Sequence, residues 1–395
     1  MTVAGLIAEY NPLHNGHALL IREMRRLGAD CVAVVMSGNF VQRGEPAILS
    51  KWARAGQALA CGADLVVELP LPWAVAGAER FALGGVAVLT ALGADVIGFG
   101  SECGEIAPLR RAREALSSAA LHDAMQVSLR AGTTFAAARQ QAVESLFGRE
   151  TALLLREPNN ILGIEYLKAV ESLGSGLKPV TVRRENVRIR TGESEGKPLT
   201  SSAVRAMFRR GEDVSEYVPA ASLRVIEKEI AAGRAPADLS SLGRGVLAVL
   251  RRTDREEFAR LPDVSEGLEN RLFDAVQKAE SLPELFRLVK TKRYPMARIR
   301  RIVLAAFLGI KASDASGTPP YLRILGIGEN GAEILRRAGE KRLLPIVSRS
   351  AEMDALGGRS AELLKLESRA ADLYALCMPR PGPCGLDRST RLALL

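Results

Sequence analysis

The first two hundred residues alternate between short apolar runs and amphipathic helical runs, and this alternation restricts the possible folds more than any other feature. The apolar runs, which we predict to be strands, cover residues 3–8, 31–36, 64–69, 95–99 and 178–182. Helical patterns at 17–27, 50–61 and 76–92 separate the first four of them. Near-continuous apolar strands that alternate with helices indicate a parallel sheet covered by helices on both faces. The pattern therefore predicts an α/β fold.

The turn after the first predicted strand carries two of the chain's three histidines, in the order His14, Asn15, Gly16, His17. In an open parallel sheet, ligands bind beyond the C-terminal ends of the strands, where the strand order reverses. A helix that begins there offers free backbone N–H groups and the positive end of its dipole to an anion. Histidines add donors, and a glycine leaves room for a phosphate. These residues indicate a triphosphate site; two histidines that only cap a helix are the alternative.

A second segment offers similar chemistry near residue 200. Thr200, Ser201 and Ser202 precede a predicted helix, and Arg205 follows one turn later. Two hydroxyls at a helix start with a nearby guanidinium suit phosphate oxygens. Ser/Thr caps followed by an arginine are also common in helices that bind nothing, and that reading stays open.

Two further segments follow predicted strands. Residues 36–46 are polar and contain two glycines, and they lie at a strand C-terminus, where substrate loops belong. Gly100 follows the strand at 95–99, and a glycine there lets the backbone approach a nucleotide base or ribose. A plain connection is the alternative for the first segment.

From about residue 212 the strand-like runs nearly disappear. Helical patterns cover 221–232, 241–259, 266–279, 282–290, 295–310 and 330–338. We place a boundary between residues 210 and 218 and predict two domains, 1–212 and 213–395, the second mostly α-helical. Residues 285–313 contain no acidic side chain and carry Arg287, Lys290, Lys292, Arg293, Arg298, Arg300, Arg301 and Lys311.

This basic block can neutralise phosphates along an RNA backbone, as can the run of Arg183, Arg184, Arg188 and Arg190. A solvated helix face is the alternative. The net charge of +9 agrees with a polyanionic partner. The five cysteines are scattered without zinc or redox spacing, which is typical of reduced thiols in a cytoplasmic protein. We find no signal peptide and no apolar stretch suited to a membrane span, so we expect no membrane partner.

The order of these motifs resembles the bacterial tRNA(Met) cytidine acetate ligases. The segments that carry the resemblance are 5–17, 37–46, 62–70, 99–102, 158–166 and 292–299. It departs at Leu13 and Ser50, where Phe and Asp are expected, and it weakens after residue 345. Residues 200–205 also partly match the Ile-Ser-Ser-Thr-x-x-Arg phosphate motif of nucleotidylyltransferases. The resemblance implies a Rossmann-like nucleotidylyltransferase (HxGH) domain with a parallel sheet, followed by a mostly α-helical tRNA-binding domain.

The resemblance also implies a reaction. ATP would activate acetate as acetyl-adenylate, and N4 of the wobble cytidine of elongator tRNA(Met) would then be acetylated. His14 and His17 would be catalytic, and Mg²⁺ is expected with ATP, without a dedicated metal site. The implied ATP contacts are Ile7, Ala8, Glu9, Tyr10, Asn11, Pro12, Leu13, His14, Asn15, Gly16, His17, Ala18, Leu19, Leu20, Gly100, Asn159 and Arg184, with Ser201, Ser202 and Arg205 from the partial motif. The tRNA contacts would be Lys292, Arg293, Arg298, Arg300 and Arg301.

Two other functions stay open. The chain could be a small-metabolite adenylyltransferase that joins AMP to a phosphorylated substrate, or a non-enzymatic RNA-binding protein on the same fold. The long basic region argues against the first, because a small substrate needs no such surface. The intact His14, Gly16, His17 and Ser202 argue against the second. No residue is predicted as a general base for the amine attack, and the sequence does not predict an oligomeric state.

Overall fold

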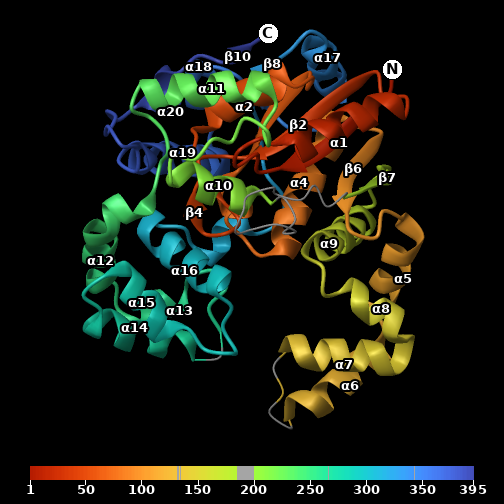
Figure 1. Cartoon of the computed structure of the whole chain (residues 1–395), viewed down its shortest axis with the longest axis vertical. Helices are drawn as coiled ribbons and strands as arrows, with labels where there is room; N and C mark the ends of the chain where they lie inside the picture. The colour runs from red at the N-terminus through yellow and green to blue at the C-terminus, as the bar shows by residue number, and fades with distance from the viewer. Residues whose placement is uncertain (131–132, 134, 185–199, 266, 342) are drawn as a thin grey trace.

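A single twisted sheet organises the molecule (Figure 1). The computed structural model describes residues 1–130, 133, 135–184, 200–265, 267–341 and 343–395. The strand order is β10-β8-β5-β2-β1-β6-β7, and β9 pairs with β8. The strands are β1 (Val3–Ala8), β2 (Cys31–Ser37), β5 (Leu65–Leu69), β6 (Val96–Ser101), β7 (Lys178–Arg183), β8 (Leu322–Ile327), β9 (Ile346–Val347) and β10 (Ala393–Leu394).

The five strands predicted in the first part of the chain are confirmed, each within about two residues at either end. They pair in parallel in the order β5-β2-β1-β6-β7. Strand β1 lies between β2 and β6, so the chain first builds the sheet to one side of β1 and then to the other. The segments that follow β1 and β6 therefore meet where the strand order reverses, which is where such sheets bind ligands.

Alternate residues of the strands pack against different helices, because successive side chains of a strand point to opposite faces. Ala4, Leu6 and Val34 pack with residues of α1 (Asn15–Arg26) and α2 (Lys51–Ala60). Val3, Ala33 and Val35 belong instead to the larger core formed with α4 (Ala78–Leu92) and α9 (Pro158–Ser172). Helices thus cover both faces, as the apolar strands predicted.

Helices away from the sheet form two groups, one on either side of the lower half of Figure 1. One group comprises α12 (Gly243–Arg252), α13 (Arg255–Ala259), α14 (Leu268–Lys278), α15 (Leu282–Val289) and α16 (Met296–Leu308). The other comprises α5 (Ile106–Leu116), α6 (Ala119–Arg130), α7 (Phe135–Phe147) and α8 (Arg149–Leu154). The remaining helices include α3 (Leu71–Ala74), α10 (Ser201–Arg209), α11 (Ala220–Ala231), α17 (Gly331–Lys341), α18 (Ser350–Asp354), α19 (Gly358–Ala375) and α20 (Leu386–Ser389). Within the described ranges, no helix is long and apolar enough to cross a membrane.

Two elements in the second half of the chain differ from the prediction, one helix and one strand. The helix predicted over 241–259 is two helices, because the Asp254 side chain accepts a hydrogen bond from the Glu257 N–H and caps a new helix, α13. Strand β8 was not predicted, since a six-residue apolar run that contains Arg323 and Gly326 has no decisive period. Strand β8 pairs antiparallel with β5, so the sheet is mixed. The division into 1–212 and 213–395 stays a prediction, but the sheet takes strands from both parts.

Candidate active site

The two histidines in the turn after β1 together cap the start of α1. Helix α1 begins at Asn15, earlier than predicted, so His14 is its N-cap residue. Nδ1 of His14 accepts a hydrogen bond from the Gly16 N–H at 3.1 Å, and the His14 N–H donates to Nδ1 of His17 at 3.2 Å. This is a reciprocal capping box, so the two histidines do cap the helix, as the alternative interpretation predicted.

Capping uses only one nitrogen of each ring. Because Nδ1 accepts in both histidines, the proton of a neutral imidazole lies on Nε2. The rings stack with centroids 3.7 Å apart, and Nε2 of His14 is buried without a hydrogen-bond partner among the described residues. Each ring therefore keeps an Nε2–H donor for a bound oxygen.

Burial keeps both imidazoles neutral. It lowers the pKa of His14 to about 3, and the positive charge of Arg184 acts in the same direction. Burial also lowers the pKa of His17 well below its usual value, with further contributions from His14 and Arg184. At neutral pH the pair is a set of uncharged donors that can stabilise negative charge as it develops.

A cavity of about 240 Å³ lies beside this pair, where the strand order reverses. Its lining comes from the start of α1, from the end of β6 and from the end of β7. The residues are His14, Asn15, Gly16, His17, Leu19, Leu20, Arg22, Gly100, Val182, Arg183 and Arg184. Eight of them were predicted as ATP contacts, whereas Arg22, Val182 and Arg183 were not. Arg183 was assigned to the RNA surface; its position directly after the strand predicted at 178–182 was the available signal.

Gly100 and Arg184 meet at the wall of this cavity. A Cβ added to Gly100 would lie 3.1 Å from Cγ of Arg184, so the glycine leaves room for that side chain. Nη1 of Arg184 donates to Oδ1 of Asn159 at 3.2 Å, and Nδ2 of Asn159 donates to Oε1 of Glu102 at 2.6 Å. Oε2 of Glu102 in turn accepts from the Asn160 N–H at the start of α9. Asn159 thus lies behind Arg184 and orients it.

The segment near residue 200 lies apart from the described lining of the cavity. Oγ1 of Thr200 accepts from the Ala203 N–H at 3.1 Å and caps α10, as predicted. Arg205 is 4% exposed; it donates to the Asn11 carbonyl at 2.9 Å and to Oγ of Ser202 at 3.1 Å. It also pairs with Glu45 at 2.8 Å. Arg205 therefore joins the turn after β1 to the loop after β2, and ATP contacts of Ser201, Ser202 and Arg205 stay predictions.

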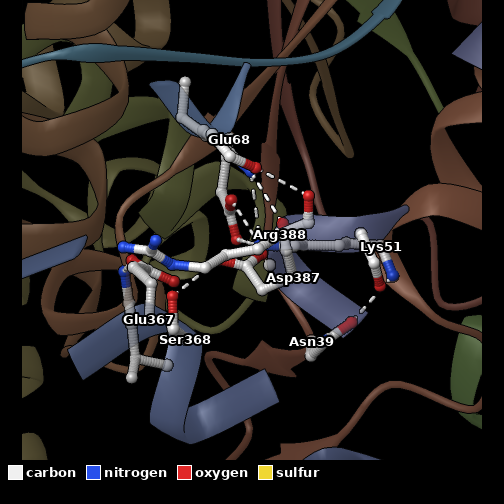
Figure 2. A network of polar contacts seen from close by, with 12 residues as sticks. Asn39, Lys51, Glu68, Glu367, Ser368, Asp387 and Arg388 are labelled. Carbon is white, nitrogen blue, oxygen red and sulfur yellow. Dashed lines mark hydrogen bonds and ion pairs between the residues drawn. The ribbon is translucent and has the colours of Figure 1, made fainter. Parts of the chain in front are cut away.

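The loop after β2, residues 37–46, contains the small ribbon of β3 (Phe40–Val41) and β4 (Glu45–Pro46) and rests on a buried charge cluster (Figure 2). Nζ of Lys51 lies 2.7 Å from Glu68 Oε2 and 2.5 Å from Asp387 Oδ1, and all three side chains are at most 2% exposed. The backbone N–H of Lys51 donates to Oδ1 of Asn39 at 2.8 Å. The cluster thus connects the loop to α2, to β5 and to α20.

Two more residues hold the same loop. Arg54 is fully buried and donates to the carbonyls of Leu49, Glu9, Ser37 and Gly38, which ties the chain beyond β1 to the end of β2. The hydroxyl of Tyr374 in α19 donates to the Ala47 carbonyl at 2.9 Å, across 327 positions of sequence. Neither contact was predicted, because no local pattern marks it.

The predicted RNA contacts divide into two groups. Arg301 pairs with Asp263 at 2.8 Å, and Arg298 donates to the Asp263 carbonyl and to Oγ of Ser265, so both guanidiniums hold α16 to the preceding loop. Lys292 and Arg293 are exposed and Arg300 is half-buried. Arg188 and Arg190 lie outside the described residues. Among those described, no group of three or more histidine, cysteine, aspartate or glutamate side chains could hold a metal ion.

Known proteins similar to this chain share its full length. The family model described as HIGH nucleotidyl transferase matches residues 1–384. A relative from a Thermoanaerobacter species, named tRNA(Met) cytidine acetate ligase, is 36% identical over 397 residues, which are 98% of each chain. One of the same name from Syntrophotalea carbinolica is 38% identical and covers 98% of this chain and 96% of its own. The crystal structure of Thermotoga maritima TmcAL bound with alpha-thio ATP has a TM-score of 0.90 and 33% identity, over all of both chains.

Proposed function

The chain belongs to the HIGH nucleotidyl transferase family and, within it, to the tRNA(Met) cytidine acetate ligases, and from this membership we propose that it acetylates N4 of the wobble cytidine of elongator tRNA(Met). The family resemblance of the motifs and the α/β prediction are thereby confirmed. The observation that carries the proposal is the pair of neutral Nε2–H donors at the start of α1, beside a cavity at the point of strand reversal.

The first step is the activation of acetate. A carboxylate oxygen of acetate attacks the α-phosphorus of ATP, acetyl-adenylate forms, and pyrophosphate leaves. The Nε2–H groups of His14 and His17 donate to phosphate oxygens and stabilise the charge that develops on them. Arg184, oriented by Asn159, supplies a positive charge at the same cavity. Mg²⁺ bound to the phosphates of ATP would neutralise part of their negative charge.

The second step transfers the acetyl group. The exocyclic amine of cytidine attacks the acetyl carbonyl, the C–N bond forms, and AMP leaves with the electron pair of the broken bond. The tRNA contacts come from the helical region, in which Lys292, Arg293 and Arg300 remain the proposed members of the predicted set. The guanidiniums of Arg298 and Arg301 also hold α16 to the loop at Asp263, and tRNA contacts of these two arginines stay predictions.

Pyrophosphate exchange tests the first step. We expect the wild-type protein to exchange labelled pyrophosphate into ATP only when acetate is present. His17→Ala should lower that rate by about 10²- to 10³-fold, the loss seen when a donor to a developing charge is removed. His122→Ala, which changes an exposed histidine on α6, is the matched control. Exchange that needs a phosphorylated small molecule in place of acetate would show the alternative adenylyltransferase.

Nucleoside analysis tests the second step. We expect tRNA from a deletion strain to lack N4-acetylcytidine at the wobble position of elongator tRNA(Met), as measured by mass spectrometry of the isolated tRNA. The wild-type gene should restore it and the His17→Ala gene should not. Modified tRNA in the deletion strain would refute the proposed substrate.

A further inference from the structure

A groove of about 780 Å³ lies between the loop after β2 and the helical region. Glu45 and Pro46 of the loop form one wall, and residues of α12, α15 and α16 form the other, among them Arg244, Phe286 and Arg300. A groove of this volume can hold a ligand of one or two nucleotides. The groove is therefore a candidate binding site at the border between the two halves of the molecule.

The wall next to the loop is fixed relative to the catalytic turn. A Cβ added to Gly44, which has φ +74°, would lie 2.5 Å from the Arg301 nitrogen, so the loop and α16 are in direct backbone contact. Glu45 pairs with Arg205, which donates to the Asn11 carbonyl in the turn after β1. A ligand in the groove would thus be held in a set position with respect to the histidine pair.

The groove carries a net positive charge when residues that already form ion pairs with each other are not counted. Its acidic residues Glu45 and Asp238 are each paired with an arginine, at 2.8 and 3.0 Å. Within the described residues, the guanidiniums of Arg244 and Arg300 form no ion pair and no hydrogen bond. Glu280 is the remaining acidic residue in the lining, so the two guanidiniums leave the groove with a net positive charge. This balance suits an anionic ligand.

One of these arginines lies over an aromatic ring. The guanidinium carbon of Arg300 is 5.9 Å from the ring centroid of Phe286, and the ring is half-buried in the groove. An aromatic ring and an adjacent arginine bind single-stranded nucleic acid well, because the ring stacks on a base and the guanidinium contacts a phosphate. A paired duplex does not expose its bases in this way.

We propose that this groove binds a single-stranded segment of the RNA substrate, with a base against Phe286 and phosphates at Arg244 and Arg300. The proposal rests on the proposed function for the identity of the RNA. The groove is joined to the turn after β1 through Glu45, Arg205 and the Asn11 carbonyl.

The test compares two pairs of substitutions that remove the same charge. Arg244→Gln with Arg300→Gln changes the groove. Arg252→Gln with Arg260→Gln changes two exposed arginines of the same helical region, one in α12 and one at the end of α13, outside the groove. The dissociation constant for a tRNA(Met) transcript is measured at several salt concentrations, together with acetate-dependent pyrophosphate exchange. Phe286→Leu removes the aromatic ring while it keeps an apolar side chain.

We expect the groove pair to weaken transcript binding by about tenfold or more and to reduce the salt slope by about 1.4, as for two lost phosphate contacts on a single strand. Phe286→Leu should weaken binding by roughly fivefold or more without a change in the slope. The control pair should change binding less than about twofold, since scattered surface charges act weakly at physiological salt. Pyrophosphate exchange should stay unchanged in every variant.

Two results would overturn the proposal. Equal weakening by the control pair would mean that only general charge attracts the RNA. Competition by a fully paired RNA duplex as strong as that by the transcript would mean that no unpaired base is bound. A wild-type protein that lacks acetate-dependent exchange would contradict the proposed function instead, and transcript binding would still report on the groove.

Discussion

The turn after β1 and the loop after β2 lie beside each other at the same edge of the sheet, but different kinds of contact hold them. The histidine pair that ends the turn is positioned by hydrogen bonds between residues two and three positions apart, His14 with Gly16 and His17, although Arg205 also holds the Asn11 carbonyl before it. The loop is fixed by buried charges and a tyrosine from α2, β5, α19 and α20, which come together only in the folded chain. The histidine cap is a local motif, and the loop is a product of the tertiary fold.

The largest effect in this comparison is expected from Lys51→Met. The substitution would leave the carboxylates of Glu68 and Asp387 buried without their shared cation. Breaking a buried pair in this way costs about 3–5 kcal/mol of the free energy of unfolding. Chemical denaturation at neutral pH measures that loss.

Lys168→Met is the matched control for this substitution. Lys168 pairs with Glu165 at 2.9 Å but is 35% exposed, so its loss should cost about 1 kcal/mol or less. If the two substitutions destabilise the protein equally, the buried cluster does not hold the loop.

The same contrast explains what the sequence could predict. Strands β1, β2, β5, β6 and β7 and the cap formed by the histidine pair follow from patterns within about ten residues, and the structure agrees with them. Strand β8 and the contact of Lys51 with Asp387 depend on pairing partners that only the tertiary fold supplies. Arg298 and Arg301 looked free in the sequence, because their partners lie outside the basic block: Arg298 donates to the Asp263 carbonyl and to Ser265, and Arg301 pairs with the Asp263 carboxylate. A local pattern identifies which residues can act, but it does not show which of them are already engaged.

The dependence of stability on pH should separate the two regions. The folded pKa of His14 is about 3, below the usual unfolded value, so the unfolded state binds the proton more readily. Its contribution to stability is complete above about pH 6.5 and is lost as the pH falls toward 3; at pH 5 the loss for one such histidine is about 2 kcal/mol. In the cluster, burial raises the pKa of Asp387, but the positive charges of Lys51 and Arg323 outweigh burial, so the folded pKa lies below its usual value. The contribution of Asp387 to stability is therefore lost only in more acidic solution.

His14→Asn tests this assignment, because asparagine can still cap α1. Denaturation of the wild type and the variant at pH 8 and pH 5 gives two stability differences. We expect the variant to lose about 2 kcal/mol less than the wild type between these pH values. Equal losses would mean that the histidine is not held neutral by its burial.

The smallest effect concerns a single hydroxyl at the loop. Tyr374→Phe removes the donor to the Ala47 carbonyl and should cost about 1 kcal/mol, since one buried acceptor loses its partner. Tyr321→Phe is its opposite: the Tyr321 hydroxyl is buried without a partner among the described residues, so its removal should be neutral or stabilising. Thermal and chemical denaturation of both variants measure the two effects. A loss at Tyr321 equal to that at Tyr374 would mean that the contact with Ala47 does not support the loop, because both substitutions remove the same group from a buried ring.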